Sequence, residues 1–403
     1  MERVRFGGEV HTNGNGTAAA NGALEIPRIY SDYAVILDSL YSLGPKRSDE
    51  FVDVLGKVAF NQDDAINALL LTAMATSSHS AEIPSSKREI GTLLYTGAPS
   101  SGKTTLLDAG FNAFGYRPEE VGKVPLHAPA QRLPGLKYKE VTDGQEKITT
   151  IPGYVLPHHK ALRVDEWTRV IALNALLDVS DTGVMINDEG LIVLNALQWV
   201  GGTANLGETV QATSKMTHAQ ASRINYGVAM NRLSARDLVG KTQMPAESVH
   251  QLIDDEEVQK LRTAANTDLL PIKLQEKVAD YTDRIQTMVF ERYNFDEDPG
   301  RLYNALGKAV ISLYILDGKL PNGGDWAKKV LGYMQSGKLS GTDYYKNLLS
   351  GMIAKDEPLS YEYVDRALKY VVPQRLAAAG RRIMKKGQRY SEAVEEFTDE
   401  VKG

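Results

Sequence analysis

The chain has no cysteine and no apolar run long enough to cross a bilayer. Without cysteine among its 403 residues, it can form no disulfide, no thiolate metal site and no cysteine nucleophile. A membrane-spanning helix needs about 18 or more consecutive apolar residues, and the N-terminal stretch also has no apolar core of the signal-peptide kind. We therefore expect neither a secreted, disulfide-bonded scaffold nor a protein that spans a membrane.

A strong charge of either sign is also missing. The formal net charge is −5, from 46 Lys and Arg against 51 Asp and Glu, so no global field attracts nucleic acid or an anionic membrane. Hydrophobic residues make up 42% and charged residues 24% of the chain, as in ordinary globular proteins. The length allows two or three domains, each with a packed core.

The most informative motif is a glycine-rich loop. It reads Gly97-Ala98-Pro99-Ser100-Ser101-Gly102-Lys103-Thr104 and fits G-x-x-x-x-G-K-[ST], the P-loop or Walker A pattern. An apolar run precedes it, and apolar residues at helical spacing follow it. In such a loop, backbone N–H groups bind phosphate, the lysine meets the β- and γ-phosphates, and the hydroxyl holds Mg²⁺. The sequence predicts a nucleoside-triphosphate site over residues 97–105, with Thr105 completing the set and Thr104 as a metal ligand.

Two acidic residues after a second apolar stretch narrow the class. Residues 161–164 are expected to form a strand that ends at Asp165 and Glu166. Asp165 is expected to hold Mg²⁺, and Glu166 to polarise the attacking water, which favours hydrolysis over transfer to a metabolite. An exposed charged turn is the alternative. Arg163 stands out, because a central parallel strand is expected to be apolar on both faces.

Further polar residues follow in an informative order. Asn205 ends a stretch expected to be a strand and is a candidate to orient the same water, with a simple turn as the alternative. Arg232 follows residues 228–230, which we interpret as helical, and is a candidate to reach the γ-phosphate of a neighbouring subunit. Arg236 and Arg223 compete for that role, and a solvated surface arginine is the alternative for each.

The motifs divide the chain into segments. Residues 1–25 carry few large apolar side chains and are expected to be a disordered leader. Residues 26–242 are expected to form an α/β nucleotide-binding domain with an insert of short strands and turns at 121–160. Helical patterns continue over 243–380, and a charged C-terminal tail follows over 381–403.

From about Glu50 to residue 375, the motifs resemble those of the MoxR-type AAA+ ATPases in their order and in their residues. The clade of these ATPases also holds MCM helicases and magnesium chelatase subunits. Besides Walker A and the acidic pair, which takes the Walker B place, the resemblance rests on Val54-Leu55-Gly56, Asn61–Ile66, Leu133-Pro134-Gly135, Ile151–Leu156, Ala172–Asp178 and the hairpin expected over Val184–Val193. It implies a P-loop AAA+ core, in which helices flank a parallel sheet, followed by an α-helical lid. Trp167 and the pair Ser100-Ser101 depart from the family's usual residues.

The same resemblance implies roles for single residues. Asn205 takes the sensor-1 place, Arg232 the arginine-finger place, and Arg301 the sensor-2 place on the lid. With Glu166 these form the expected catalytic set. The implied cofactors are ATP and Mg²⁺, and the preference for ATP over GTP rests on the resemblance alone. Use of cellular ATP and the lack of a membrane span favour a cytoplasmic location.

These features predict a ring-forming ATPase that remodels a protein client, in the manner of a MoxR-like chaperone. The ring is expected to be a homo-oligomer, a hexamer by preference, with an arginine supplied across each interface. A DNA-associated AAA+ motor or loader is the alternative, for which Lys137, Lys139 and the cluster 381–389 are the local basic signals. The hairpin expected at 184–193 carries acidic residues and no Lys or Arg, so nucleic acid is the less favoured partner. A monomeric P-loop kinase is a third reading, and no membrane partner is expected.

Overall fold

The structure is a computed structural model. It describes residues 35–77, 89–125, 133–142, 145–169, 176, 179, 183–187, 190–194, 196–206, 216–232, 243–266, 269–338, 343–355 and 358–403. The leader expected at residues 1–25, most of the helix expected after the acidic pair, and the candidate Arg236 lie outside the described residues.

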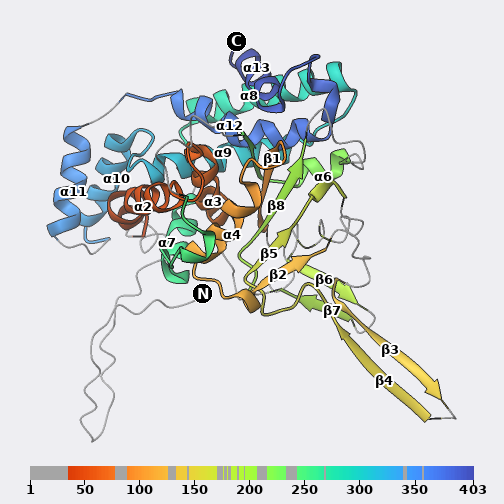
Figure 1. Ribbon diagram of the computed structural model, residues 1–403. Coiled ribbons are helices and arrows are strands. Elements are labelled where there is room, and N and C mark those ends of the chain that lie inside the picture. Colours follow the sequence, from red (N-terminus) through yellow and green to blue (C-terminus); the bar gives the residue numbers. More distant parts are fainter. Residues whose placement is uncertain are drawn as a thin grey trace, which may run out of the picture.

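A parallel sheet forms the centre of the protein (Figure 1). Its five strands lie in the order β2 (Val121–Val124), β5 (Ala161–Val164), β8 (Trp199–Asn205), β1 (Gly91–Gly97) and β9 (Tyr226–Met230). β1 is buried along its whole length, and the apolar run Leu93-Leu94-Tyr95 lies at its middle. The chain runs from β1 to β2, three places away, so the end of β1 lies at a switch in strand order, where open α/β sheets bind their ligands.

Helices cover the sheet on its two faces. α3 (Asp63–Ala75) packs on β1 and β9, α4 (Lys103–Ala113) packs on β8 and β1, and α12 (Glu362–Ala377) packs on β9 and β1. Leu106, Leu107 and Phe111 of α4 are buried, and Phe111 stacks on Trp199 of β8 with ring centroids 4.8 Å apart. The apolar spacing in the sequence after the loop therefore becomes the buried face of α4.

Two glycines let large side chains approach β8. A Cβ at Gly201 would lie 2.5 Å from Cδ1 of Leu107, and one at Gly202 would collide with the ring of Trp167. Because successive residues of a strand face opposite sides, α4 covers one face of β8 and Trp167 the other. Trp167 is 1% exposed. The bulky residue after the acidic pair, unusual for the family that the sequence resembles, is accommodated by the missing side chain at Gly202.

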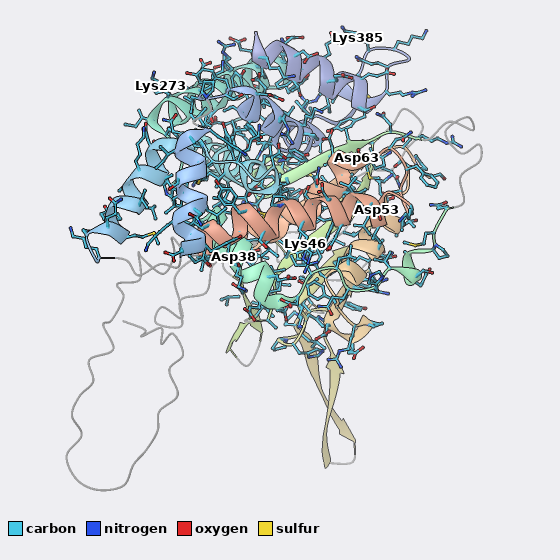
Figure 2. All side chains as sticks on the ribbon, turned by 90° about the vertical axis from the view of Figure 1, so that its left-hand side faces the viewer. Asp38, Lys46, Asp53, Asp63, Lys273 and Lys385 are labelled. Carbon is cyan, nitrogen blue, oxygen red and sulfur yellow. The ribbon has the colours of Figure 1, made fainter. Side chains whose placement is uncertain are left out.

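Two hairpins lie outside the central sheet. β3 (Gly135–Thr142) and β4 (Gln145–Pro152) pair antiparallel from Gly135↔Pro152 to Thr142↔Gln145. This hairpin projects well away from the body in both Figure 1 and Figure 2, which views the molecule from a direction turned by 90°. The second hairpin joins β6 (Val184–Asn187) and β7 (Gly190–Val193), which confirms the hairpin predicted over Val184–Val193.

The C-terminal part is helical, as predicted. After β9 come α7 (Asp255–Ala265), α8 (Ile272–Tyr293), α9 (Pro299–Leu316), α10 (Gly323–Gln335), α11 (Asp343–Ala354), α12 and α13 (Tyr390–Lys402). α12 packs on α8, α9 and α13 as well as on the sheet, and so joins the helical part to the strands. The charged segment after residue 380 includes α13, whose Tyr390, Val394 and Phe397 are buried. None of the helices that the structure describes is long and apolar enough to cross a membrane.

One local prediction is wrong. Residues 228–230, interpreted as helical, belong to strand β9, which pairs with β1 from Leu93↔Tyr226 to Gly97↔Met230. Periodicity cannot distinguish a short apolar run in a helix from a buried strand. Pairing with β1 and burial against α12 decide the conformation, and these are tertiary contacts.

Gly202→Ala is expected to destabilise the protein by about 1–3 kcal/mol, because the added methyl group must displace the buried Trp167 ring. Urea unfolding measures the change. Gly332→Ala in α10 is the control: a Cβ there meets nothing within 4 Å, so the helix should gain about 0.5–1 kcal/mol. Equal effects of the two substitutions would contradict the proposed packing of Trp167 on β8.

Candidate nucleoside-triphosphate site

The glycine-rich loop connects the end of β1 to the start of α4. Its backbone has positive φ at Gly97 (145°), Ser100 (63°) and Gly102 (84°). At Gly97 a side chain would collide with the main-chain oxygen of Met230 on β9, so the close strand contact requires glycine. The loop delivers the chain to the N-terminus of α4, whose first N–H groups have no partner within the helix and favour an anion.

Lys103 lies beneath this loop. Its Nζ donates to the main-chain oxygens of Gly97 (3.1 Å) and Ala98 (2.7 Å) and to Oγ of Ser101 (3.2 Å). The side chain is buried, and burial lowers the pKa of its ammonium group to about 8, although the nearby Glu166 carboxylate acts in the opposite direction. A cation with so little solvent around it interacts strongly with phosphate.

Glu166 and Asn205 meet at the same edge of the sheet. The side-chain amide of Asn205 donates to the Glu166 carboxylate, and the Glu166 N–H donates to Oγ1 of Thr203 (3.2 Å). Asn205 also pairs in register with Gly97, the first residue of the loop. Glu166 has φ of 52°, which is uncommon for a residue with a side chain and costs about 1–3 kcal/mol. The backbone and the amide together fix the direction of this carboxylate.

Thr104 and Asp165 supply oxygen donors suited to Mg²⁺. Thr104 is exposed in the first turn of α4, beside Thr105, and Asp165 follows β5 with 42% of its side chain exposed. A hydroxyl and a carboxylate fit Mg²⁺, which keeps several waters and is commonly bound together with substrate phosphates. Within the described residues no group of three or more His, Asp or Glu could hold a metal ion by itself. The donor set therefore fits Mg²⁺ that binds jointly with a triphosphate.

The candidate arginines lie at two opposite edges of the sheet. Arg232 is exposed two residues beyond Met230, at the edge of the loop. Arg223 lies before β9 and Arg301 at the start of α9, and both line a small pocket next to Ile90, where β1 begins. β1 has seven residues, so the two edges are about 20 Å apart. The structure thus brings Lys103, Asp165, Glu166 and Asn205 together, but it does not bring Arg301, expected at the nucleotide, to this chain's own loop.

α12 fixes the position of the turn that carries Arg223. Nε2 of Gln374 donates to the main-chain oxygen of Asn225 (2.8 Å), and Nη1 of Arg375 donates to that of Ala221 (2.8 Å). Arg375 also pairs with the buried carboxylate of Glu297 at 2.8 Å. No sequence motif marks Gln374 and Arg375 as anchors, although adjacent polar residues within an otherwise buried helix are a signal of such anchoring.

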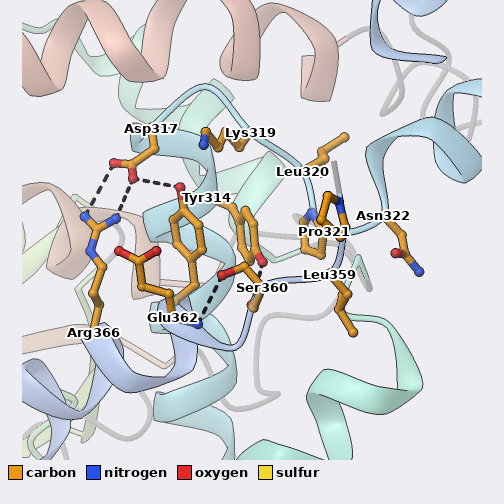
Figure 3. A pocket seen from close by; sticks show the side chains of 12 residues that line it. Tyr314, Asp317, Lys319, Leu320, Pro321, Asn322, Leu359, Ser360, Glu362 and Arg366 are labelled. Carbon is orange, nitrogen blue, oxygen red and sulfur yellow. Dashed lines mark hydrogen bonds and ion pairs between the residues drawn. The ribbon is translucent and has the colours of Figure 1, made fainter. Parts of the chain in front are cut away.

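A cavity of about 200 Å³ in the helical part is remote from these residues (Figure 3). It lies between the end of α9 and the start of α12, and no residue of the glycine-rich loop lines it. Its polar groups pair with one another: Arg366 and the Tyr363 hydroxyl with Asp317, and the Tyr314 hydroxyl with the main-chain oxygen of Ser360 (3.0 Å). The cavity is not part of the candidate nucleotide site.

Comparison with known proteins supports the fold. The sequence matches no family model and no curated protein. The structure is similar to the crystal structure of a putative ATPase from Cytophaga hutchinsonii, with a TM-score of 0.53 and 13% sequence identity, over 82% of this chain and 99% of that chain. At this identity the similarity shows the fold alone. It confirms the predicted architecture of a helix-flanked parallel sheet followed by a helical region.

The adjacent histidines His158 and His159, within the insert at 121–160, provide a test of this region. Nδ1 of the buried His159 accepts the N–H of Leu156 (3.1 Å), and burial, with a contribution from His158, lowers the pKa of His159 to about 4. In the unfolded chain this histidine has a pKa of about 6.5, so it binds a proton at pH values at which the folded chain leaves it neutral. Stability is therefore expected to fall by about 1–2 kcal/mol between pH 7 and pH 5.

Urea unfolding at several pH values measures this fall as a difference between variants. His159→Gln should remove that part of the pH dependence, whereas His158→Gln, a change at the exposed neighbour, should keep it. The interpretation fails if both variants show the same dependence as the wild type.

Proposed function

We propose that this protein is a Mg²⁺-dependent ATPase of the MoxR type, which hydrolyses ATP in a homo-oligomeric ring. The observation that carries the proposal is the contact of Asn205 with Glu166 at the edge where β1 ends in the glycine-rich loop. Three neighbouring strands, β1, β5 and β8, supply the phosphate loop, the acidic pair and the amide at this edge.

Each residue then has a chemical task. Lys103 neutralises charge on the β- and γ-phosphates, and Thr104 with Asp165 would hold Mg²⁺, which neutralises charge developing on the phosphate oxygens. Glu166 accepts a hydrogen bond from the attacking water and aligns it with the γ-phosphorus. Asn205 keeps the Glu166 carboxylate in the direction that this requires. The choice of ATP follows the family resemblance of the sequence.

The arrangement of arginines favours a ring. In a head-to-tail ring, each subunit presents one edge to the opposite edge of its neighbour, and the contact closes after a fixed number of copies. Arg223 and Arg301 lie at the edge away from their own loop, and this supports a role on the neighbour's phosphates. Arg223 thereby becomes our first candidate for the arginine finger, and Arg232 the alternative. Six copies remain the expectation from the resemblance.

The hairpins suit contact with a client. The β3–β4 hairpin projects from the body (Figure 1), and we propose that it meets a protein that the ring remodels. A DNA-associated motor is the alternative. Salt-dependent DNA binding that disappears when Lys137 and Lys139 are neutralised would favour that alternative.

Glu166→Gln is expected to lower the rate of ATP hydrolysis about a hundredfold or more, since the amide no longer polarises the attacking water. ATP binding should persist, because the loop and Lys103 are unchanged. Phosphate release measures the rate, and a fluorescent ATP analogue measures binding. Lys103→Ala is the control and should lose binding as well. Hydrolysis by Glu166→Gln at the wild-type rate would contradict the assigned role.

Subunit mixing tests whether the arginine acts across an interface. Arg223→Ala is expected to lower the rate of hydrolysis about 10³-fold. For the wild type alone, the rate per molecule should rise steeply with protein concentration. Mixing Arg223→Ala with Glu166→Gln should restore activity, because the second variant donates Arg223 to intact sites of the first.

The same mixture made with Arg232→Ala identifies the arginine concerned. No recovery is expected there if Arg232 serves its own loop, and recovery only in this mixture would assign the finger to Arg232. If neither mixture recovers activity and the rate per molecule is independent of concentration, the protein acts as a monomer and the ring proposal is refuted.

A further inference from the structure

Arg163 is a charged residue on a central strand. It belongs to β5, which lies between β2 and β8, and only 15% of its side chain is exposed. Such strands are expected to be apolar on both faces, and a charge with little solvent needs partners. Among the residues that the structure describes, Arg163 has two such partners, Asp108 and the candidate Mg²⁺ ligand Asp165.

The guanidinium of Arg163 lies between two carboxylates. Its Nε donates to both oxygens of Asp165, at 3.0 and 3.1 Å, and its Nη2 lies 2.9 Å from Oδ2 of the same residue. Its Nη1 donates to Oδ1 of Asp108 at 2.5 Å. Asp165 and Asp108 therefore bind different nitrogens of the same guanidinium group. Asp108 lies four residues after Thr104 on α4, about one turn along the helix from the other candidate Mg²⁺ ligand.

This arrangement affects how Asp165 can serve a metal ion. A carboxylate that already accepts several charge-assisted hydrogen bonds is partly neutralised and attracts a cation less strongly. Mg²⁺ must therefore compete with Arg163 for Asp165. Asp108 offers the displaced guanidinium a second carboxylate, so Arg163 need not become a buried unpaired charge when it releases Asp165.

We infer that Arg163 is a positioning residue that sets the Mg²⁺ threshold of this site by exchanging between Asp165 and Asp108. Arg163 holds Asp165 before the metal arrives, and Asp108 retains Arg163 once Asp165 turns to Mg²⁺. The inference rests on the proposed function in one respect, that the loop binds a nucleotide together with Mg²⁺.

A Mg²⁺ titration of nucleotide binding tests the inference without hydrolysis. The 403-residue chain is mixed with a fluorescent ADP analogue in EDTA, Mg²⁺ is then added, and the Mg²⁺ concentration at half-maximal signal is recorded. Arg163→Met is expected to lower this midpoint about five- to tenfold, because Asp165 loses its competing cation. Asp108→Asn is expected to raise it about threefold, because Arg163 then has Asp165 as its remaining partner.

The double variant separates exchange from simple loss of charge. If Asp108 acts through Arg163, Asp108→Asn should change the midpoint by less than about twofold in the Arg163→Met background. The same factor in both backgrounds would show that Asp108 acts directly on the metal and would overturn the exchange. Arg366→Met is the matched control. It removes an arginine that pairs with an aspartate, Asp317, in the helical part, and it should leave the midpoint unchanged.

The outcomes distinguish this inference from the proposed function. If the wild type binds no nucleotide with or without Mg²⁺, the proposed function fails. If the wild type binds nucleotide independently of Mg²⁺, or if its binding depends on Mg²⁺ but Arg163→Met has the same midpoint, the inference alone is overturned. Circular dichroism verifies that each variant is folded. Should Arg163→Met not fold, Asp108→Asn decides: a raised midpoint supports the inference, and an unchanged or lowered one overturns it.

Discussion

Parallel pairing around β1 is the constraint on which the candidate site depends. Parallel strands end at the same edge, so pairing of Gly97 with Asn205 and of Val164 with Gly202 places the loop, the acidic pair and the amide together. A register shift of two residues would move Asn205 by about 7 Å along β8 and away from Glu166.

Much of this arrangement could be predicted from the sequence, because its signals are local. The spacing of the loop glycines around Lys103 demands a particular backbone, and apolar runs that end in polar residues mark β5 and β8. The features that escaped prediction depend on contacts between distant segments. The sequence predicts a helix at residues 228–230, whereas this short run gains its strand conformation in β9 from contacts with β1 and α12. The position of Arg301 depends on how α9 packs, which no motif encodes.

Two residues that are unexpected in the sequence, Trp167 and Arg163, each have a physical counterpart elsewhere in the chain. Trp167 fits because Gly202 has no side chain, and Arg163 is tolerated on a central strand because two carboxylates receive it. In both cases the unusual residue and its compensation lie on different elements. In the motif alone such a residue looks unfavourable, whereas in the folded chain a residue on another element compensates for its size or its charge.

The joint between α12 and the turn before β9 has a mechanical consequence. Gln374 and Arg375 hold main-chain oxygens of that turn rather than side chains, so substitutions within the turn cannot remove the acceptors. Gly227 adds to the joint, because the absence of a Cβ there lets Gln374 lie directly against β9. A rigid displacement of α12 must therefore move the turn, and Arg223 with it, by a similar amount.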